Sequence, residues 1–376
     1  MNTDTPATAD AGNKAAAPAA PVGGTDIVTF KGEIDILCNQ RLPHLDQGPI
    51  KAYSARSARG GANNSHVAFV CELALVPRMR AAGKMAAIIN PGLARLVGAG
   101  VVNWPPVKGQ RYIFIYENNM STRLMQGDNK GGLGWKPERV IATVVKPMIS
   151  VLMDLRDKDL VHGNIRASNM FVTGTGVNER VVLGDCLSTP PGLLQPLVYE
   201  PVERAMADPL ARGQGSFEDD LYAFGVTLTV ILRTRDPLDG MTEEEIIREK
   251  MEMGTYSALT GKERFTGGIL ELLRGLLYDD RGQRWTLDEI EAWDQGQRLS
   301  PKQSARKIKA SRPIHFNDER YFRPTLLAMD LPKNTTEAVQ IVENDTLGQW
   351  VSRSLEDKQI AARLEEAIDA AQENGP

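Results

Sequence analysis

The chain lacks the features that mark a secreted, zinc-knuckle or membrane-spanning protein. Its 376 residues include three cysteines, Cys38, Cys71 and Cys186. Their number is odd, their spacing is wide and no CxxC pair occurs, so neither a disulfide framework nor a zinc knuckle is indicated. No run of about eighteen apolar residues occurs, and the start has no basic flank followed by an apolar stretch. The sequence therefore predicts a cytoplasmic protein with no membrane partner.

The chain also lacks a strong excess of charge of one sign. It carries 44 lysines and arginines against 48 aspartates and glutamates, which gives a formal net charge of −4. This balance provides no general attraction to nucleic acid or to an anionic membrane surface. The hydrophobic content of 42% is ordinary for a globular protein. We therefore expect proteins or small molecules as partners, and no nucleic acid.

The first third of the chain changes from a tail to a β-rich region. Residues 1–25 are mostly Ala, Pro, Thr and Gly with little to bury, so a disordered tail is predicted. Residues 26–118 alternate short β-type stretches with turns, which predicts an antiparallel sheet. The expected strands contain "IDILCN", "IKAYSA", "HVAFVCE" and "RYIFIYE". A helix is expected at residues 77–89, where the turn-forming "NPG" follows.

Helical periodicity dominates the rest of the chain, so the predicted fold class is α+β. Residues 119–295 form the main helical region, with long helices expected at 218–233, 242–253, 266–278 and 286–293. Residues 296–312 concentrate Lys, Arg, Ser and Pro and indicate a basic linker, with a docking patch for an acidic partner as the alternative. Residues 313–376 are expected to form a mostly helical C-terminal extension, in which "TLGQWVSRSLEDKQIAARLEEAI" has one continuous apolar face.

The stretch "LVHGNIRASNMFV" at residues 160–172 carries the most specific signal. Its "HGNIRASN" resembles the protein kinase catalytic loop HRDxKxxN at the same spacing. Further along, "VVLGDCLS" is similar to the segment with the kinase DFG motif and "YEPVER" to the APE end of the activation segment. "DDLYAFGV" resembles the start of the central helix, and "DDRGQRWTLDEI" the late arginine region. The chain is thus identified as a degenerate member of the protein kinase-like superfamily.

The resemblance implies a two-lobed fold, with a small β-rich N-lobe at 26–118 and a larger helical C-lobe at 119–295. It also implies roles for residues near the loop. Asn164 occupies the position of the catalytic aspartate, and Arg166 that of the motif's basic residue. Asn169 and Asp185 match the pair of residues that binds the metal and the cofactor in kinases. The alternative is that both residues persist only because they form the loop and the turn.

Four further residues are implied as supports of the fold. His162 matches the histidine of the catalytic loop, and Asp220 lies at the start of the central helix. Glu203 and Arg284 are expected to form a buried ion pair that joins the end of the activation segment to the late helices.

Much of the machinery of phosphoryl transfer is missing. Kinases use a glycine loop, a lysine held by a helix glutamate, metal ions and an aspartate base. The loop region here offers only Gly48, and "VAFVCE" has Val70 or Cys71 where the lysine belongs. Lys51 on the neighbouring strand is the candidate replacement, as in the with-no-lysine kinases.

Two further absences weigh against catalysis. No acidic residue lies between Glu72 and Glu117, so the helix at 77–89 cannot hold a lysine by an ion pair. The side-chain amide of Asn164 cannot accept a proton as a base.

We therefore expect a bacterial-type pseudokinase that acts in signalling as a scaffold or allosteric regulator of a protein partner. Binding of ATP with Mg²⁺ or Mn²⁺ through Lys51, Asn169 and Asp185 is expected to be weak. Two alternatives remain open. One is a weak serine/threonine protein kinase, and the other is a transferase of nucleotidyl or amino-acid groups that uses Arg166, Asn169 and Asp185.

Overall fold

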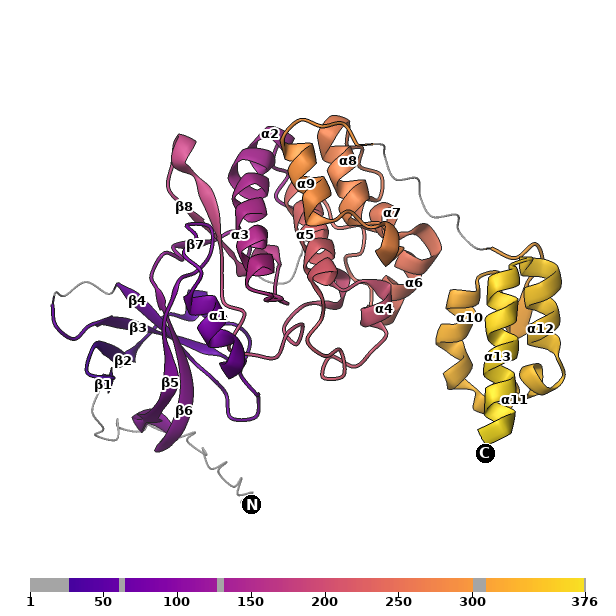
Figure 1. Ribbon diagram of the computed structural model, residues 1–376, viewed down its shortest axis with the longest axis horizontal. Coiled ribbons are helices and arrows are strands. Elements are labelled where there is room, and N and C mark those ends of the chain that lie inside the picture. The colour runs from indigo at the N-terminus through magenta and orange to yellow at the C-terminus, as the bar shows by residue number, and fades with distance from the viewer. Residues whose placement is uncertain (1–26, 61–64, 127–131, 300–308, 375–376) are drawn as a thin grey trace, which may run out of the picture.

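The computed structural model describes residues 27–60, 65–126, 132–299 and 309–374. The tail expected at residues 1–25 lies outside these ranges, as do residues 300–308 of the expected basic linker. Along the chain, an N-terminal β-sheet region is followed by a helical region and then by a smaller helical extension (Figure 1). The mixed α+β class predicted from the sequence is confirmed. No helix among the described residues is long and apolar enough to cross a membrane.

The N-terminal region is built on one antiparallel six-stranded sheet with the order β1-β2-β3-β4-β6-β5. Its strands are β1 (Ile27–Phe30), β2 (Ile34–Arg41), β3 (Lys51–Ser57), β4 (His66–Val70), β5 (Leu96–Trp104) and β6 (Gly109–Glu117). Successive side chains of a strand point to opposite faces. In β4, Val67 and Phe69 therefore join the main core beneath the sheet, whereas Ala68 and Val70 pack in a second cluster on the other face.

The helix expected at residues 77–89 is much shorter than predicted. A 3-10 turn (Met79–Ala81) leads into α1 (Ala82–Ala86), which has five residues. Gly83 lowers helix propensity at its centre, and Ala81 at the N-cap provides no side-chain acceptor for the free backbone amides. A helix this short is held by its contacts with β5 and the core rather than by its own backbone bonds.

The main helical region surrounds α5 (Phe217–Leu232), whose residues Asp219 to Leu232 are all buried. Its first turn is fixed by a capping box between Ser216 and Asp219. The other helices are α2 (Pro137–Val140), α3 (Lys146–Asp157), α4 (Val202–Ala205), α6 (Glu243–Met253), α7 (Thr255–Thr260), α8 (Gly267–Leu276) and α9 (Leu287–Asp294). A π-helical segment (Ile141–Val145) joins α2 to α3. A small sheet of β7 (Thr122–Arg123), β8 (Met170–Thr173) and β9 (Arg180–Leu183) flanks them.

The C-terminal extension has its own apolar core. It contains β10 (Ile314–Phe316), β11 (Glu319–Tyr321), α10 (Pro324–Asp330), α11 (Thr335–Glu343), α12 (Thr346–Trp350) and α13 (Lys358–Asn374). The single helix expected near the end is interrupted after a π-helical segment (Val351–Leu355), because Glu356 adopts a left-handed conformation with φ of 57°. The extension meets α6 through ion pairs, among them Arg248 with Asp330 and Arg323 with Glu252.

Candidate functional site

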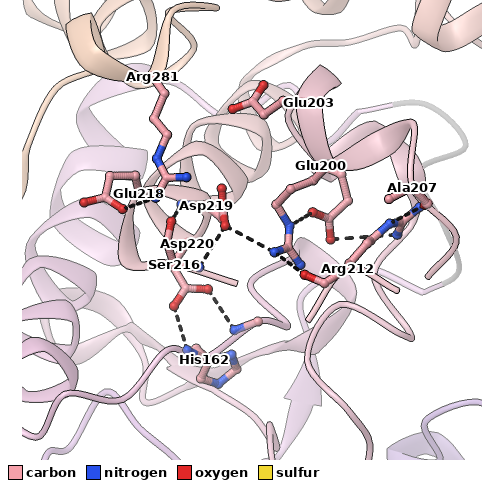
Figure 2. Close-up of polar contacts among 12 residues, drawn as sticks. His162, Glu200, Glu203, Ala207, Arg212, Ser216, Glu218, Asp219, Asp220 and Arg281 are labelled. Atoms are coloured by element: carbon pink, nitrogen blue, oxygen red, sulfur yellow. Dashed lines mark hydrogen bonds and ion pairs between the residues drawn. The ribbon is translucent and has the colours of Figure 1, made fainter. Parts of the chain in front are cut away.

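The loop after α3 is held in place by the start of α5. Both oxygens of the buried Asp220 carboxylate accept backbone hydrogen bonds, from His162 N at 2.6 Å and from Gly163 N at 2.8 Å (Figure 2). The imidazole of His162 is fully buried, and its Nε2 lies 3.2 Å from Gly184 O. His162 and Asp220 thus contact backbone on both sides of the loop, as residues that support its conformation.

Burial shifts the pKa of both side chains in a direction that disfavours charge. It lowers the pKa of His162 to about 3, with Arg78 acting in the same direction, although the contact with Gly184 opposes it. Burial raises the pKa of Asp220 to about 7, although its two backbone hydrogen bonds oppose this shift. His162 is therefore a neutral core histidine near pH 7 rather than a proton carrier.

Three side-chain amides meet where the resemblance implies the catalytic and metal-binding residues. Asn164 donates through Nδ2 to Gln47 Oε1 and to Asp185 O, each at 3.0 Å. Gln47 in turn donates through Nε2 to Asn169 Oδ1 at 2.7 Å. Asn169 donates to Asn164 O at 2.9 Å and to Asp185 O at 3.0 Å. We call Gln47, Asn164 and Asn169 the amide cluster. All three side chains are buried, between 0% and 5% exposed.

Gln47 enters the amide cluster from the turn between β2 and β3, the region where kinases carry their glycine loop. Gln47 and Ile50 exchange two backbone hydrogen bonds, so the turn is tight. Gly48 within it has φ of 54°, and a Cβ there would lie 3.1 Å from Leu194 Cδ2. A glycine fits this position because the backbone is left-handed and the space is filled.

Arg123 fastens the same turn to the helical region. Its guanidinium donates to the carbonyl oxygens of His44 and Asp46 at 3.1 Å, and also to that of Ser168. A guanidinium offers five donors in a planar fork, so one side chain can join separate backbone segments. The β2–β3 turn is thus bound at two places, by Gln47 and by Arg123.

The carboxylate of Asp185 accepts three hydrogen bonds from protein groups. Its Oδ1 accepts hydrogen bonds from Tyr116 Oη at 2.5 Å and from Leu187 N at 3.0 Å, and its Oδ2 accepts one from Ser188 N at 3.2 Å. Mg²⁺ requires oxygen ligands with open lone pairs and room for water. In this arrangement the side-chain oxygen of Asn169 and both oxygens of Asp185 already accept hydrogen bonds from protein donors, so a metal ion would have to compete with them. Among the described residues, no group of three His, Cys, Asp or Glu side chains could hold a metal ion.

Lys51 does not join the residues with which the sequence grouped it. Its ammonium lies 3.1 Å from Gly48 O and 3.5 Å from Asp46 Oδ2, and the side chain is 44% exposed. At the place expected for the kinase lysine, Val70 and Cys71 are buried apolar side chains. The structure thus brings Asn164, Asn169 and Asp185 together and leaves Lys51 in a surface ion pair.

Arg78 lies just before α1, the helix expected at the position where kinases carry the glutamate that holds their lysine. Its guanidinium donates to His162 O at 3.0 Å, Cys186 O at 3.1 Å and Val161 O at 2.7 Å. Its backbone N–H donates to Leu187 O at 2.8 Å. The segment before α1 is therefore bound directly to the loop and to the segment that contains Asp185.

Arg166 also acts on backbone rather than on an open site. Its Nη1 donates to Leu194 O at 2.7 Å, and the residue is 7% exposed. Residues 190–194 lie close to the loop here, because Gly192 N donates to Gly163 O and a Cβ on Gly163 would lie 2.7 Å from Pro191 Cβ. Gly163 has φ of 67°, so this close approach requires glycine.

The thiols near the site are poor nucleophiles. Burial raises the pKa of Cys71 and of Cys186 to about 12 in each case. Because the thiolate is the reactive form, neither cysteine is suited to covalent group transfer near pH 7.

Glu203 and Arg284 meet, but only the arginine is buried. Arg284 Nη2 lies 3.5 Å from Glu203 Oε1, with side chains 1% and 43% exposed. A more buried ionic network lies beside them, in which Arg204 contacts Glu200 at 2.9 Å and Asp219 at 3.4 Å (Figure 2). This network joins the end of the activation-segment-like stretch to the first turn of α5.

Sequence reasoning missed Gln47, Tyr116, Arg78 and Arg123. For Tyr116 a signal existed, since it lies in the alternating strand "RYIFIYE" and a buried tyrosine hydroxyl needs a partner. The other three contact residues 45 to 122 positions away, and no local pattern marks such contacts.

Comparison with known proteins gives a partial and distant relationship. A scan against models of protein families finds no match. U-box domain-containing protein 33 of Arabidopsis thaliana is 26% identical over 178 residues, which cover 45% of this chain and 20% of that protein. The LRR receptor-like serine/threonine-protein kinase GHR1 of the same plant is 28% identical over 173 residues, which cover 43% of this chain and 16% of that protein. The serine/threonine-protein kinase GRIK1 of Arabidopsis thaliana is 26% identical over 168 residues, which cover 43% of this chain and 41% of that protein.

The chain thus spans less than half the length of each of these relatives. The similarity to the two proteins named as kinases supports a distant kinase-like relationship.

Proposed function

We propose that the chain is a pseudokinase, a two-lobed kinase-like domain that does not transfer phosphoryl groups and acts as a scaffold or regulator of a protein partner. The partial similarity to plant kinases supports the kinase-like assignment. So does the order of the chain, with a β-sheet region before a helical region and the kinase-like motifs in sequence from His162 to Arg284.

The observation that carries the proposal is the position of Gln47. Its side-chain amide uses both of its ends, one on Asn164 and one on Asn169. A nucleotide with its metal must displace Gln47 and break these two hydrogen bonds before it reaches the oxygen of Asn169. Catalysis by kinases depends on precise positioning of phosphates and metal, so a site that must first be opened is poorly prepared for it.

Binding of ATP with Mg²⁺ or Mn²⁺ is weak under this proposal. Lys51 is engaged with Asp46 and Gly48, and Asp185 accepts three hydrogen bonds from the protein. An apparent affinity is reduced by the fraction of molecules whose site is open.

A protein partner is supported by exposed apolar side chains around α1. Leu73, Val76 and Ile89 are 71%, 72% and 73% exposed, and Met79 is 51% exposed. Large apolar side chains left exposed near one short segment are compatible with an interaction site.

Calorimetric titration with ATP and either metal tests the proposal. The proteins compared are the wild type, the single variant Gln47→Ala and the double variant that combines Gln47→Ala with Asp185→Ala. We expect little or no saturable heat for the wild type, measurable binding for Gln47→Ala and loss of that binding in the double variant. Gln110→Ala, at an exposed glutamine, is the control.

A transfer assay with ATP labelled at the α- or γ-phosphate then tests activity. We expect no incorporation of label by any of these proteins. Incorporation by the wild type that disappears in Asp185→Ala would contradict the proposal, and the labelled position would distinguish nucleotidyl transfer from phosphoryl transfer.

A further inference from the structure

A cavity of about 780 Å³ lies between the main helical region and the C-terminal extension. The main region contributes residues of α4, α6, α7 and α8, and the extension contributes residues of α10 and α13. None of its lining residues belongs to the amide cluster or to the loop at 160–169. Its volume falls within the range of roughly 300 to 1,000 Å³ that is typical of small-molecule sites.

The wall of the cavity is mainly apolar. Large apolar side chains from both parts of the chain line it, namely Met206, Met251, Met253, Leu277 and Ile360. Met206 and Met253 are 50% and 46% exposed, so their side chains are free to repack around a ligand. Methionine is unbranched and polarizable, which makes it suited to apolar ligands of variable shape.

Cations border this apolar wall. Arg274 lies over the ring of Tyr256, with its guanidinium 5.4 Å from the ring centroid, and Arg363 lines the cavity from α13. Within the ranges that the structure describes, neither arginine has a carboxylate partner. The two carboxylates that line the cavity are already engaged, Glu203 with Arg284 and Asp279 with the backbone N–H of Thr255.

Lys250 adds a buried amine to the same wall. It is 1% exposed, and its Nζ donates to Val198 O at 2.6 Å and to Glu200 O at 2.9 Å. Burial lowers the pKa of Lys250 to about 7, although the nearby carboxylates of Asp279 and Glu200 act to raise it. The Nζ also lies 5.2 Å from the centroid of the Tyr222 ring, so the amine is held by groups within the protein.

We propose that this cavity binds an amphipathic anion, a molecule with a single aliphatic chain that ends in a carboxylate. The apolar wall accepts the chain, and Arg274 and Arg363 attract the carboxylate at the border. A cationic amphiphile of the same length would contact the same apolar wall, but the two arginines would repel its head group. This site is separate from the one in the proposed pseudokinase function, and its test uses no nucleotide.

The aliphatic chain of a bound ligand would touch both the main helical region and the C-terminal extension. Ala328 and Ile360 of the extension and Met251 of the main region line the same space. A ligand that contacts both parts favours the state in which the extension is docked, by mass action.

Calorimetric titration of the full chain with sodium dodecanoate, below its micelle concentration, tests the proposal. We expect saturable binding at one molecule per chain, and no saturable binding of dodecyltrimethylammonium. Ala328→Trp should abolish binding by filling the cavity from the extension side. Ser257→Trp, from α7, should do the same from the main region, and melting curves identify whichever variant is folded.

Charge is tested by Arg274→Gln combined with Arg363→Gln. Loss of two exposed ionic contacts should weaken dodecanoate binding about tenfold. Arg353→Gln changes an exposed arginine outside the cavity and should bind like the wild type. No saturable binding of dodecanoate, equal binding of the cationic amphiphile, or undiminished binding by a folded tryptophan variant would overturn the proposal.

Discussion

The side chains of Gln47 and Asn169 meet in a buried hydrogen bond of 2.7 Å although 122 positions separate them in the sequence. Gln47 comes from the sheet region and Asn169 from the helical region. The contact joins the two regions at the position where the resemblance implies a nucleotide. What a kinase would keep open for phosphates is here filled by protein amides.

Replacing Gln47 with Ala should destabilise the protein. Asn169 Oδ1 loses its donor, and leaving a buried polar group unpaired costs about 1 to 3 kcal/mol. Urea denaturation measures the change in the free energy of unfolding, and Gln110→Ala should change it by less than about 0.5 kcal/mol. Equal stability of the two variants would mean that Gln47 contributes no net hydrogen bonding.

Asn164→Asp should lower stability and create no kinase. Asn164 Nδ2 donates to Gln47 Oε1 and to Asp185 O, so a carboxylate would face two oxygens in a buried site. The penalty of an unpaired buried group is at least about 1 to 3 kcal/mol and rises when the group is charged. The lysine and the helix glutamate of a kinase would still be missing.

The measurements for Asn164→Asp are urea denaturation and transfer of label from ATP to a generic protein substrate with both metals. Asn164→Ala is the control, since it removes the same hydrogen bonds without adding charge, and it should be the less destabilised of the two. Robust phosphorylation by Asn164→Asp would mean that Asn164 was the single defect of the site.

The two partners of the Arg284–Glu203 pair should respond unequally to substitution. Arg284 is buried and also donates to Tyr278 O at 3.1 Å, so Arg284→Leu should cost about 3 to 5 kcal/mol. Glu203 is 43% exposed, and Glu203→Gln should cost no more than about 1 kcal/mol. Chemical denaturation of both variants checks this order, and comparable losses would show that the pair acts as a buried unit.

His162 should make stability depend on pH. Its pKa is lowered to about 3 in the folded protein, so below the ordinary value of about 6.5 the unfolded chain binds a proton that the folded chain does not. Its contribution to stability therefore falls as pH decreases from about 6.5 towards 3, by about 1.4 kcal/mol per unit. The free energy of unfolding of the wild type minus that of His162→Gln should decrease over this window. A constant difference would mean that His162 titrates normally.

Asp220 should have the opposite effect in an overlapping window. Its pKa is raised to about 7, so above its ordinary value of about 4 the unfolded chain releases a proton that the folded chain keeps. Its contribution to stability therefore falls as pH rises from about 4 to 7. The free energy of unfolding of the wild type minus that of Asp220→Asn should decrease in that direction, and an increase would contradict the raised pKa.

The sequence predicted the elements with strong periodicity and the residues within recognisable motifs. The helices at α5, α6, α8 and α9 lie within two residues of their expected bounds, because their caps and apolar faces are local. Asn164 and Asn169 both donate to the backbone oxygen of Asp185, and His162 contacts the backbone oxygen of the neighbouring Gly184.

What failed depends on contacts between distant segments. The expected helix at 77–89 is shortened, and the ion pair of Lys51 with Asp46 was not foreseen. Glu200 is the more buried of the two glutamates in "YEPVER", although only Glu203 was predicted to have a structural role. No period or spacing indicated that Gln47 would occupy the site, since its partners were fixed only by folding.

Arg78, Arg123 and Gln47 together attach the sheet region to the helical region at separate points, each through hydrogen bonds within the protein. Under the proposed function, a protein fastened in this way would already have the shape that its partner meets, so association would not first have to select a rare conformer. Under the same proposal, a nucleotide would find few unfastened points at which it could open and close the molecule.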